Sequence, residues 1–196
     1  LDTIENSHEY VDLGLSVKWA TCNVGASKPE EYGDYFAWGE TEPKSNYGWS
    51  TYKWCNGSYS TLTKYNTSSS YGTVDNKTQV DFSDDAARAN WGGAWRMPTI
   101  EEWLELRTEC TWTWTTENGV YGCKMTGPNG NSIFLPAAGS MYGGSLSGDG
   151  SWGYYWSSSL SSSYSDDVYL LYFSSSEDAL YRGNRPVGRT VRPVSE

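Results

Sequence analysis

A block near the end of the chain has the residue types that proteins use to bind ligands. Residues 157–182, SSSLSSSYSDDVYLLYFSSSEDALYR, are dominated by Ser and Tyr with a few acids and contain no Trp, whereas the rest of the chain is rich in Trp. Tyrosine gives a large amphipathic contact area at low entropic cost, and Ser and Asp add adaptable hydrogen bonds. The block therefore predicts a binding surface.

Eight side chains of this block are expected to be exposed ligand contacts: Tyr164, Asp166, Asp167, Leu170, Tyr172, Glu177, Tyr181 and Arg182. The run VYLLYF has the pattern of a strand with Tyr169, Leu171 and Phe173 on one face. We therefore expect Leu171 and Phe173 to face inward and to support the contacts. The competing interpretation is a plain polar loop and sheet edge, a common use of serine-rich sequence.

Residues suited to catalysis or metal binding are scarce. The chain has no Walker A loop, dinucleotide fingerprint, HExxH motif, EF-hand loop or GxSxG elbow. The single histidine, His8, is a poor partner for a Ser or Cys nucleophile because it lies in a segment expected to fray. Asp84-Asp85 and Glu101-Glu102 fit helix starts better than a carboxylate pair, and Asp166-Asp167 alone is weak evidence for Ca²⁺. We predict no catalytic residues, no metal site, no cofactor and no enzyme activity.

Length and composition predict one aromatic-rich domain over residues 1–196, with residues 1–8 as a frayed N-terminal segment. The net charge of −10 disfavours nucleic acid and anionic lipid as partners. No stretch has the length of a transmembrane helix, and no signal peptide is present. The start at Leu1 instead of Met is expected of a processed or trimmed product.

Cysteine number and spacing leave the thiol state open. Cys22, Cys55, Cys110 and Cys123 form no CxxC pair, and four cysteines allow three full pairings. A bridge between Cys110 and Cys123 is conceivable because the two flank a predicted hairpin. Free, buried thiols are the favoured expectation.

Two short helices and several antiparallel strands are predicted, which is an α+β organisation. FSDDAARANWG offers Ser83 as an N-cap, and MPTIEEWLELRTEC has a capping box of Thr99 and Glu102. Asn118-Gly119 signals a type I′ hairpin. Residues 41–80, which are rich in Ser, Thr, Tyr, Asn and Gly, should be irregular.

The eleven Trp residues suggest a second function, carbohydrate binding, because sugar faces stack on aromatic rings. Trp49 and Trp54, in the polar region, are the best candidates. Core packing is the more common role of any one Trp. It is expected here for Trp38, Trp91, Trp95, Trp103, Trp112 and Trp156.

Six motifs in order resemble one family. EYVDLGLSVKWATCNVGA, GDYFAWGE, WGGAWRMPTIEEWLEL, IFLPAAG, YYWSSS and GRTVRPV together resemble the major paralogous domain of Fibrobacter and Bacteroidetes. That family is related to the C-type-lectin-like and formylglycine-generating-enzyme-like fold. The resemblance covers residues 9–194. It implies small antiparallel sheets, two short helices, long irregular loops, and adjacent N- and C-terminal strands.

The same resemblance implies an exported protein, either on the cell surface as an outer-membrane lipoprotein or extracellular. Some relatives of the fold are the variable proteins of diversity-generating retroelements. Their C-terminal block changes on a fixed scaffold, and the layout of residues 155–194 is similar. The enzyme branches of the fold need a C-terminal cysteine pair or iron-binding histidines, and neither is present.

We therefore expect a non-catalytic, monomeric adhesion or ligand-binding domain for an unknown protein or glycan, with its site in the C-terminal block. The alternatives are a carbohydrate-binding module that uses exposed Trp and a structural component of a cell-surface appendage.

Overall fold

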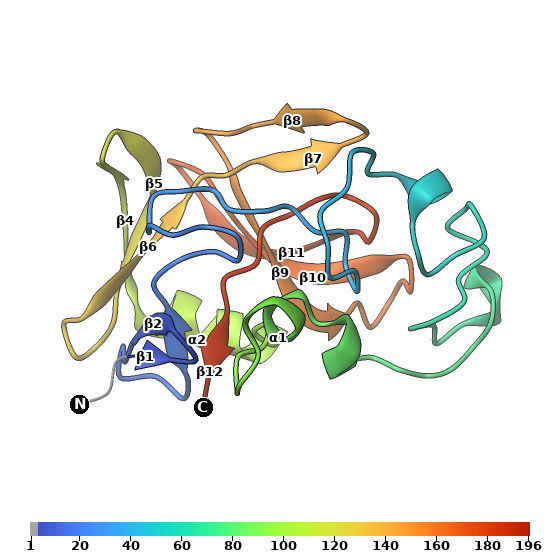
Figure 1. Cartoon of the computed structure of the whole chain (residues 1–196), viewed down its shortest axis with the longest axis horizontal. Coiled ribbons are helices and arrows are strands. Elements are labelled where there is room, and N and C mark those ends of the chain that lie inside the picture. Colours follow the sequence, from blue (N-terminus) through green and yellow to red (C-terminus); the bar gives the residue numbers. More distant parts are fainter. Residues whose placement is uncertain (1–3) are drawn as a thin grey trace.

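The computed structural model describes residues 4–196, which form an α+β structure (Figure 1). Two α-helices accompany four small antiparallel sheets of four, three, three and two strands. The predicted α+β class, with two short helices and small antiparallel sheets, is confirmed.

The first sheet brings distant parts of the chain together. Its strands lie in the order β1-β2-β3-β12, with bounds Ile4–Glu5, His8–Val11, Lys18–Ala20 and Val194–Ser195. Val194 pairs with Trp19 in antiparallel register. An early strand and the last strand are therefore neighbours, as expected.

The start of the described chain is ordered by packing. Residues 4–8 form β1, a turn and the first residue of β2. The ring of His8 stacks on that of Trp91, with centroids 3.8 Å apart and an interplanar angle of 4°. The prediction that residues 1–8 fray is therefore wrong for residues 4–8, because an aromatic contact and a strand ladder fix them. Residues 1–3 lie outside the described part of the chain.

The first helical segment uses a different cap from the one predicted. It consists of a 3-10 helix followed by an α-helix, η3 (Phe82–Asp84) and α1 (Ala86–Trp91). Asp85 caps α1, since its Oδ1 accepts from the backbone N–H groups of Ala87 and Arg88 at 2.9 and 3.1 Å. Its Oδ2 accepts from the N–H of Met97 at 2.9 Å. Ser83, the predicted cap, lies inside η3.

The second helix, α2 (Ile100–Glu109), begins as predicted. The Thr99 side chain accepts from the Glu102 N–H at 3.2 Å, and the Glu102 carboxylate accepts from the Thr99 N–H at 2.8 Å, which confirms the capping box. Glu102 also pairs with Arg96 at 2.6 Å.

Within residues 4–196, no helix is both long and apolar enough to cross a bilayer.

The sheet β4-β5-β6 consists of three consecutive strands, Thr111–Glu117, Val120–Thr126 and Ser132–Pro136. Asn118 and Gly119 join the first two with φ angles of 47° and 81°. Positive φ at both positions is what a type I′ turn requires, so the predicted hairpin is present.

The four cysteines are free thiols in this structure. Cys110 and Cys123 are buried, and burial is the main cause that raises the pKa of their thiols to about 11 and about 12. Cys22 and Cys55 are half-buried. The favoured expectation of free thiols is met, whereas full burial applies to only two of the four.

The remaining strands form a two-stranded and a three-stranded sheet. β7 (Ser140–Tyr142) pairs with β8 (Ser145–Ser147), within the glycine-rich stretch 139–153. The other sheet has the order β11-β10-β9, with bounds Asp178–Asn184, Asp167–Phe173 and Gly153–Leu160. β10 is therefore a central strand with a neighbour on each side.

Two apolar cores cover the two faces of this sheet. Leu170 belongs to the first core, whereas the adjacent Leu171 and Phe173 belong to the second. The first core also contains Ala20, Phe36, Trp38, Trp91, Trp95, Trp156 and Val191. The second core also contains Trp19, Trp103, Leu106, Cys123, Tyr155 and Val194. Because successive strand residues point to opposite faces, β10 contributes to both cores.

Candidate ligand-binding surface

The predicted contacts lie along the β10–β11 ladder, which has two distinct ends. Asp167 pairs with Asn184 at one end, and Phe173 pairs with Asp178 at the other. At about 3.3 Å per residue, these ends are about 20 Å apart. In Figure 1 the irregular segment 41–80 and the β4–β5 hairpin lie on opposite sides of the molecule, with this sheet between them.

The first end carries five polar residues, here called the loop-side cluster: Tyr164, Asp166, Asp167, Arg182 and Asn184. The Arg182 guanidinium lies over the Tyr164 ring, 4.2 Å from its centroid. Arg182 Nε is 3.6 Å from Asp167 Oδ2, and Asn184 Nδ2 donates to Asp167 Oδ1 at 2.7 Å. Tyr164 is 44% exposed. Four of the eight predicted contacts thus lie together here, with an ordered cation over an exposed ring.

Charge is concentrated at this end of the ladder. Burial raises the pKa of Asp167, and the neighbouring carboxylate of Asp166 raises it further, while Asn184 and Arg182 oppose the shift. Burial also raises the pKa of Tyr71, and Asp166 adds to that effect. Tyr71 belongs to the 3-10 helix η2 (Ser69–Tyr71). The irregular segment therefore contributes to the same surface as the C-terminal block.

A buried arginine holds these two parts of the chain together. Arg185 is 0% exposed. Its guanidinium donates to the backbone oxygens of Lys64, Tyr65 and Ser165 at 2.9, 2.9 and 3.0 Å, and to the hydroxyl of Tyr52 at 3.0 Å. A fully hydrogen-bonded buried cation fixes the position of every group that it contacts. Sequence reasoning missed Arg185, whose only sequence signal is an arginine shortly after the end of the block.

Tyr181 and Leu170 are cross-strand partners with opposite exposure. They pair across β10 and β11, so their side chains share one face of the sheet. Tyr181 is 65% exposed on the edge strand. Leu170 is 1% exposed, and the prediction that it is an exposed contact is wrong. The reason is that β10 is central and covered on both faces, whereas the prediction assumed one buried face.

The second end of the ladder carries the remaining predicted contacts. The Tyr172 hydroxyl donates to Glu177 Oε1 at 3.0 Å, and the ring of Tyr172 lies 5.3 Å from that of Tyr154. Glu177 is exposed, and Tyr172 is half-buried against the first core. The eight predicted residues therefore do not form one patch. Leu171 and Phe173 are both 0% exposed, as predicted.

The tryptophans proposed for sugar binding are not open platforms. Trp54 is half-buried, its indole N–H donates to the Gly39 oxygen at 2.7 Å, and the ammonium groups of Lys53 and Lys64 cover its ring at 4.6 and 4.7 Å. Trp49 is half-buried. Trp152, which the sequence did not single out, is 43% exposed. Its only signal is its position within GDGSWG, a glycine-rich and otherwise polar turn.

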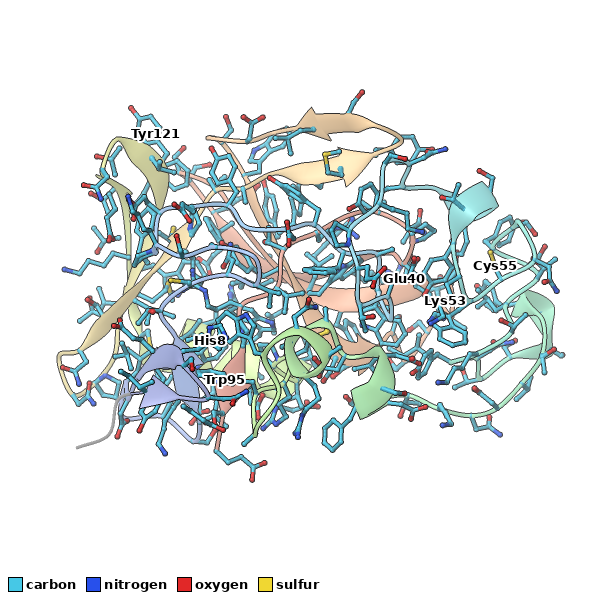
Figure 2. All side chains as sticks on the ribbon, in the orientation of Figure 1. His8, Glu40, Lys53, Cys55, Trp95 and Tyr121 are labelled. Atoms are coloured by element: carbon cyan, nitrogen blue, oxygen red, sulfur yellow. The ribbon has the colours of Figure 1, made fainter. Side chains whose placement is uncertain are left out.

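A cavity of about 370 Å³ lies beside His8, near Trp95 in Figure 2. Glu9, Cys22 and Trp91 also line it. Burial lowers the pKa of His8, whose ring is stacked on Trp91. Residues 4–196 contain no group of three or more His, Cys, Asp or Glu side chains that could hold a metal ion. Stacking on Trp91 gives His8 a packing role.

Comparisons with protein-family models, with curated proteins and with solved structures give no match for this chain.

Proposed function

We propose that the chain is a non-catalytic ligand-binding domain with a C-type-lectin-like fold, exported to the cell surface or beyond it. Its ligand is a protein, bound by the loop-side cluster together with Tyr71 and Tyr181. The observation that carries the proposal is the Tyr164–Arg182 stack beside Asp167. It presents a cation and an anion on the β10–β11 ladder, next to the ring of Tyr164 in the loop before β10.

The physical argument is preorganisation. Ordering flexible side chains during binding costs about 0.5–1.5 kcal/mol for each one. Arg182 is already held by a ring on one side and a carboxylate on the other, so less of this cost remains. Tyrosine and arginine are also the residues that dominate protein–protein binding energies. The Arg182–Asp167 pair favours a partner whose surface carries both an acidic and a basic group.

The pattern of exposure also supports a surface whose side chains can vary. Tyr164 and Tyr181 project outward, while Val168, Leu171 and Phe173 below them are fully buried. Substitution of the outward residues changes the surface and leaves the cores intact. A diversified block on a fixed scaffold needs this separation.

The proposal is tested by screening the chain against an array of purified extracellular proteins. Matched screens use the double variant Tyr164→Ala/Arg182→Ala and the control Tyr142→Ala, which removes a ring that is 72% exposed on β7. We expect partners that the wild type and the control retain and that the double variant loses. Partners that all three proteins bind equally would refute the site. Self-association as the only interaction would favour the structural-component alternative.

A genetic measurement tests diversification separately. The gene and its neighbourhood are sequenced across many cells of the source population. A nearby near-copy of the segment that encodes residues 157–190, differing only at adenines, is the expected result. A fixed sequence with no such copy would mean one inherited ligand.

A further inference from the structure

The turn between β10 and β11 faces a row of aromatic side chains. Trp112 and Trp114 on β4 and Tyr121 on β5 share one face of their hairpin, because Trp114 pairs with Cys123 and Thr116 pairs with Tyr121. The rings of Trp114 and Tyr121 are stacked, with centroids 5.9 Å apart and an interplanar angle of 12°. Tyr121 is 52% exposed and lies at the outer end of the hairpin (Figure 2).

Two adjoining depressions separate this row from the turn. The larger has a volume of about 300 Å³ and lies between Trp114, Tyr121 and Trp152 on one side and Ser174–Ser176 on the other. The smaller, about 150 Å³, is lined by Trp112, Trp114, the same serines, Glu177 and Asp178. We call the two together the aromatic groove. It combines flat rings with a cluster of hydroxyl groups.

The walls of the groove are fixed from below. Phe173 packs edge-on against Trp112 and Trp114, with centroids 5.9 and 6.4 Å apart. The Trp152 ring lies against Gly148, and the backbone N–H of Trp152 donates to the Gly148 oxygen at 2.8 Å. The rings therefore keep their places without a ligand.

The polar groups define the ligand chemistry. No Lys or Arg lines either depression, which disfavours recognition of phosphate or sulfate. Asp178 already pairs with Arg107 at 2.5 Å. An apolar ligand would bury the serine hydroxyls without partners, at a cost. A neutral sugar ring suits both walls. The C–H groups on its faces can stack on the aromatic rings, and the hydroxyls at its edge can hydrogen-bond to the serines.

We propose that the aromatic groove binds an uncharged oligosaccharide. Trp152, Trp114 and Tyr121 stack against sugar faces, and Ser174–Ser176 and Glu177 bond to sugar hydroxyls. Pockets of about 300 Å³ stand at the lower end of the range for small-ligand sites, which suits one or two sugar rings at a time. This site is at the opposite end of the ladder from the loop-side cluster and does not rest on the function proposed there.

The test follows the indole N–H signals in NMR spectra while neutral hexasaccharides of glucose, xylose, mannose and galactose are added. The Trp152→Phe variant identifies the Trp152 signal. We expect at least one sugar to shift this signal with a dissociation constant on the order of 1 mM or lower. A sulfated hexasaccharide of the same sugar should bind more weakly, because the carboxylates of Glu177 and Asp178 line the smaller depression and repel anions.

Variants separate the groove from the rest of the surface. Trp152→Ala and Tyr121→Ala should each weaken sugar binding about tenfold or more, with the other indole signals unchanged as evidence of folding. Tyr142→Ala removes a ring that is 72% exposed on β7 and lines neither depression, so this variant should bind sugar as the wild type does. The absence of binding by every neutral sugar would overturn the proposal. Equal binding by all variants would overturn it as well.

Discussion

The two ends of the β10–β11 ladder use similar residues for different chemistry. At the loop-side cluster, Arg182, Asp167 and Tyr164 form a charged and partly exposed group. At the other end, Ser174–Ser176 face the aromatic groove, whose larger depression is lined by no charged side chain. Serine and tyrosine do not by themselves define a site. What faces them across the surface decides which ligand class fits.

Removal of Arg185 should produce the largest effect and should affect the loop-side end. Arg185→Met leaves the oxygens of Lys64, Tyr65 and Ser165 without their buried donor. We expect a loss of about 3–5 kcal/mol in the free energy of unfolding, measured by denaturant titration. Arg182→Met removes a partly exposed cation from β11, just before Arg185 in the chain, and should change the free energy of unfolding by no more than about 0.5 kcal/mol. Equal losses in the two variants would contradict this account.

The aromatic groove depends on a glycine. A Cβ on Gly153 would lie 2.2 Å from Cζ of Phe173, the ring that supports Trp112 and Trp114. Gly153→Ala should therefore destabilise the protein by about 1–3 kcal/mol and shift both indole signals. Gly48→Ala is the matched control. A Cβ added at Gly48 would have no atom within 4 Å apart from its chain neighbours, and the φ of −173° is open to any residue. Unmoved indole signals in Gly153→Ala would show that Phe173 does not position the groove.

Asp75 stabilises the irregular segment that faces the loop-side cluster. Burial alone would raise its pKa, but backbone N–H groups of Asn66, Lys77 and Tyr65 donate to its carboxylate and lower the pKa below 3.8. Asp75→Asn should cost about 1 kcal/mol at pH 7. Because the folded-state pKa is depressed, this stabilisation is present above pH 3.8 and is lost as the pH falls through the folded-state value. Chemical denaturation of both proteins from pH 7 to pH 2 measures the difference.

Asp167 should show the opposite dependence on pH. Its pKa is raised above 3.8, first by burial and then by Asp166, so folding favours the protonated form. The stability of the wild type relative to Asp167→Asn should therefore be higher near pH 3 and should fall as the pH rises through the folded-state pKa. The same denaturation series measures it. If the stability of the wild type relative to Asp167→Asn rises with pH, as expected for Asp75, the raised pKa inferred for Asp167 is wrong.

Local signals were enough to predict the elements that rely on local contacts. The Thr99–Glu102 capping box and the Asn118-Gly119 turn are each complete within four residues, so sequence alone reveals them. The cap of α1 was missed because Asp85 also accepts from Met97, twelve residues away. A long-range bond of this kind selected Asp85 over the neighbouring Ser83.

The binding surface was harder to predict because it depends on neighbours. Leu170 has the sequence context of an exposed strand residue, and only the strand order shows that β9 and β11 flank it. Trp152 is exposed because it follows a tight glycine turn at the surface. Arg185 has partners about 120 residues away in the chain. These features depend on tertiary contacts that no local pattern encodes.

The pairing of β3 with β12 has a consequence for the order of folding. Each core contains residues from both ends of the chain: Ala20 and Val191 in the first core, Trp19 and Val194 in the second. Neither core is complete until residues 191–194 pack against residues 19–20, and the long loops must close before these contacts form. Contacts between residues so far apart in the sequence are expected to make folding of this domain slow.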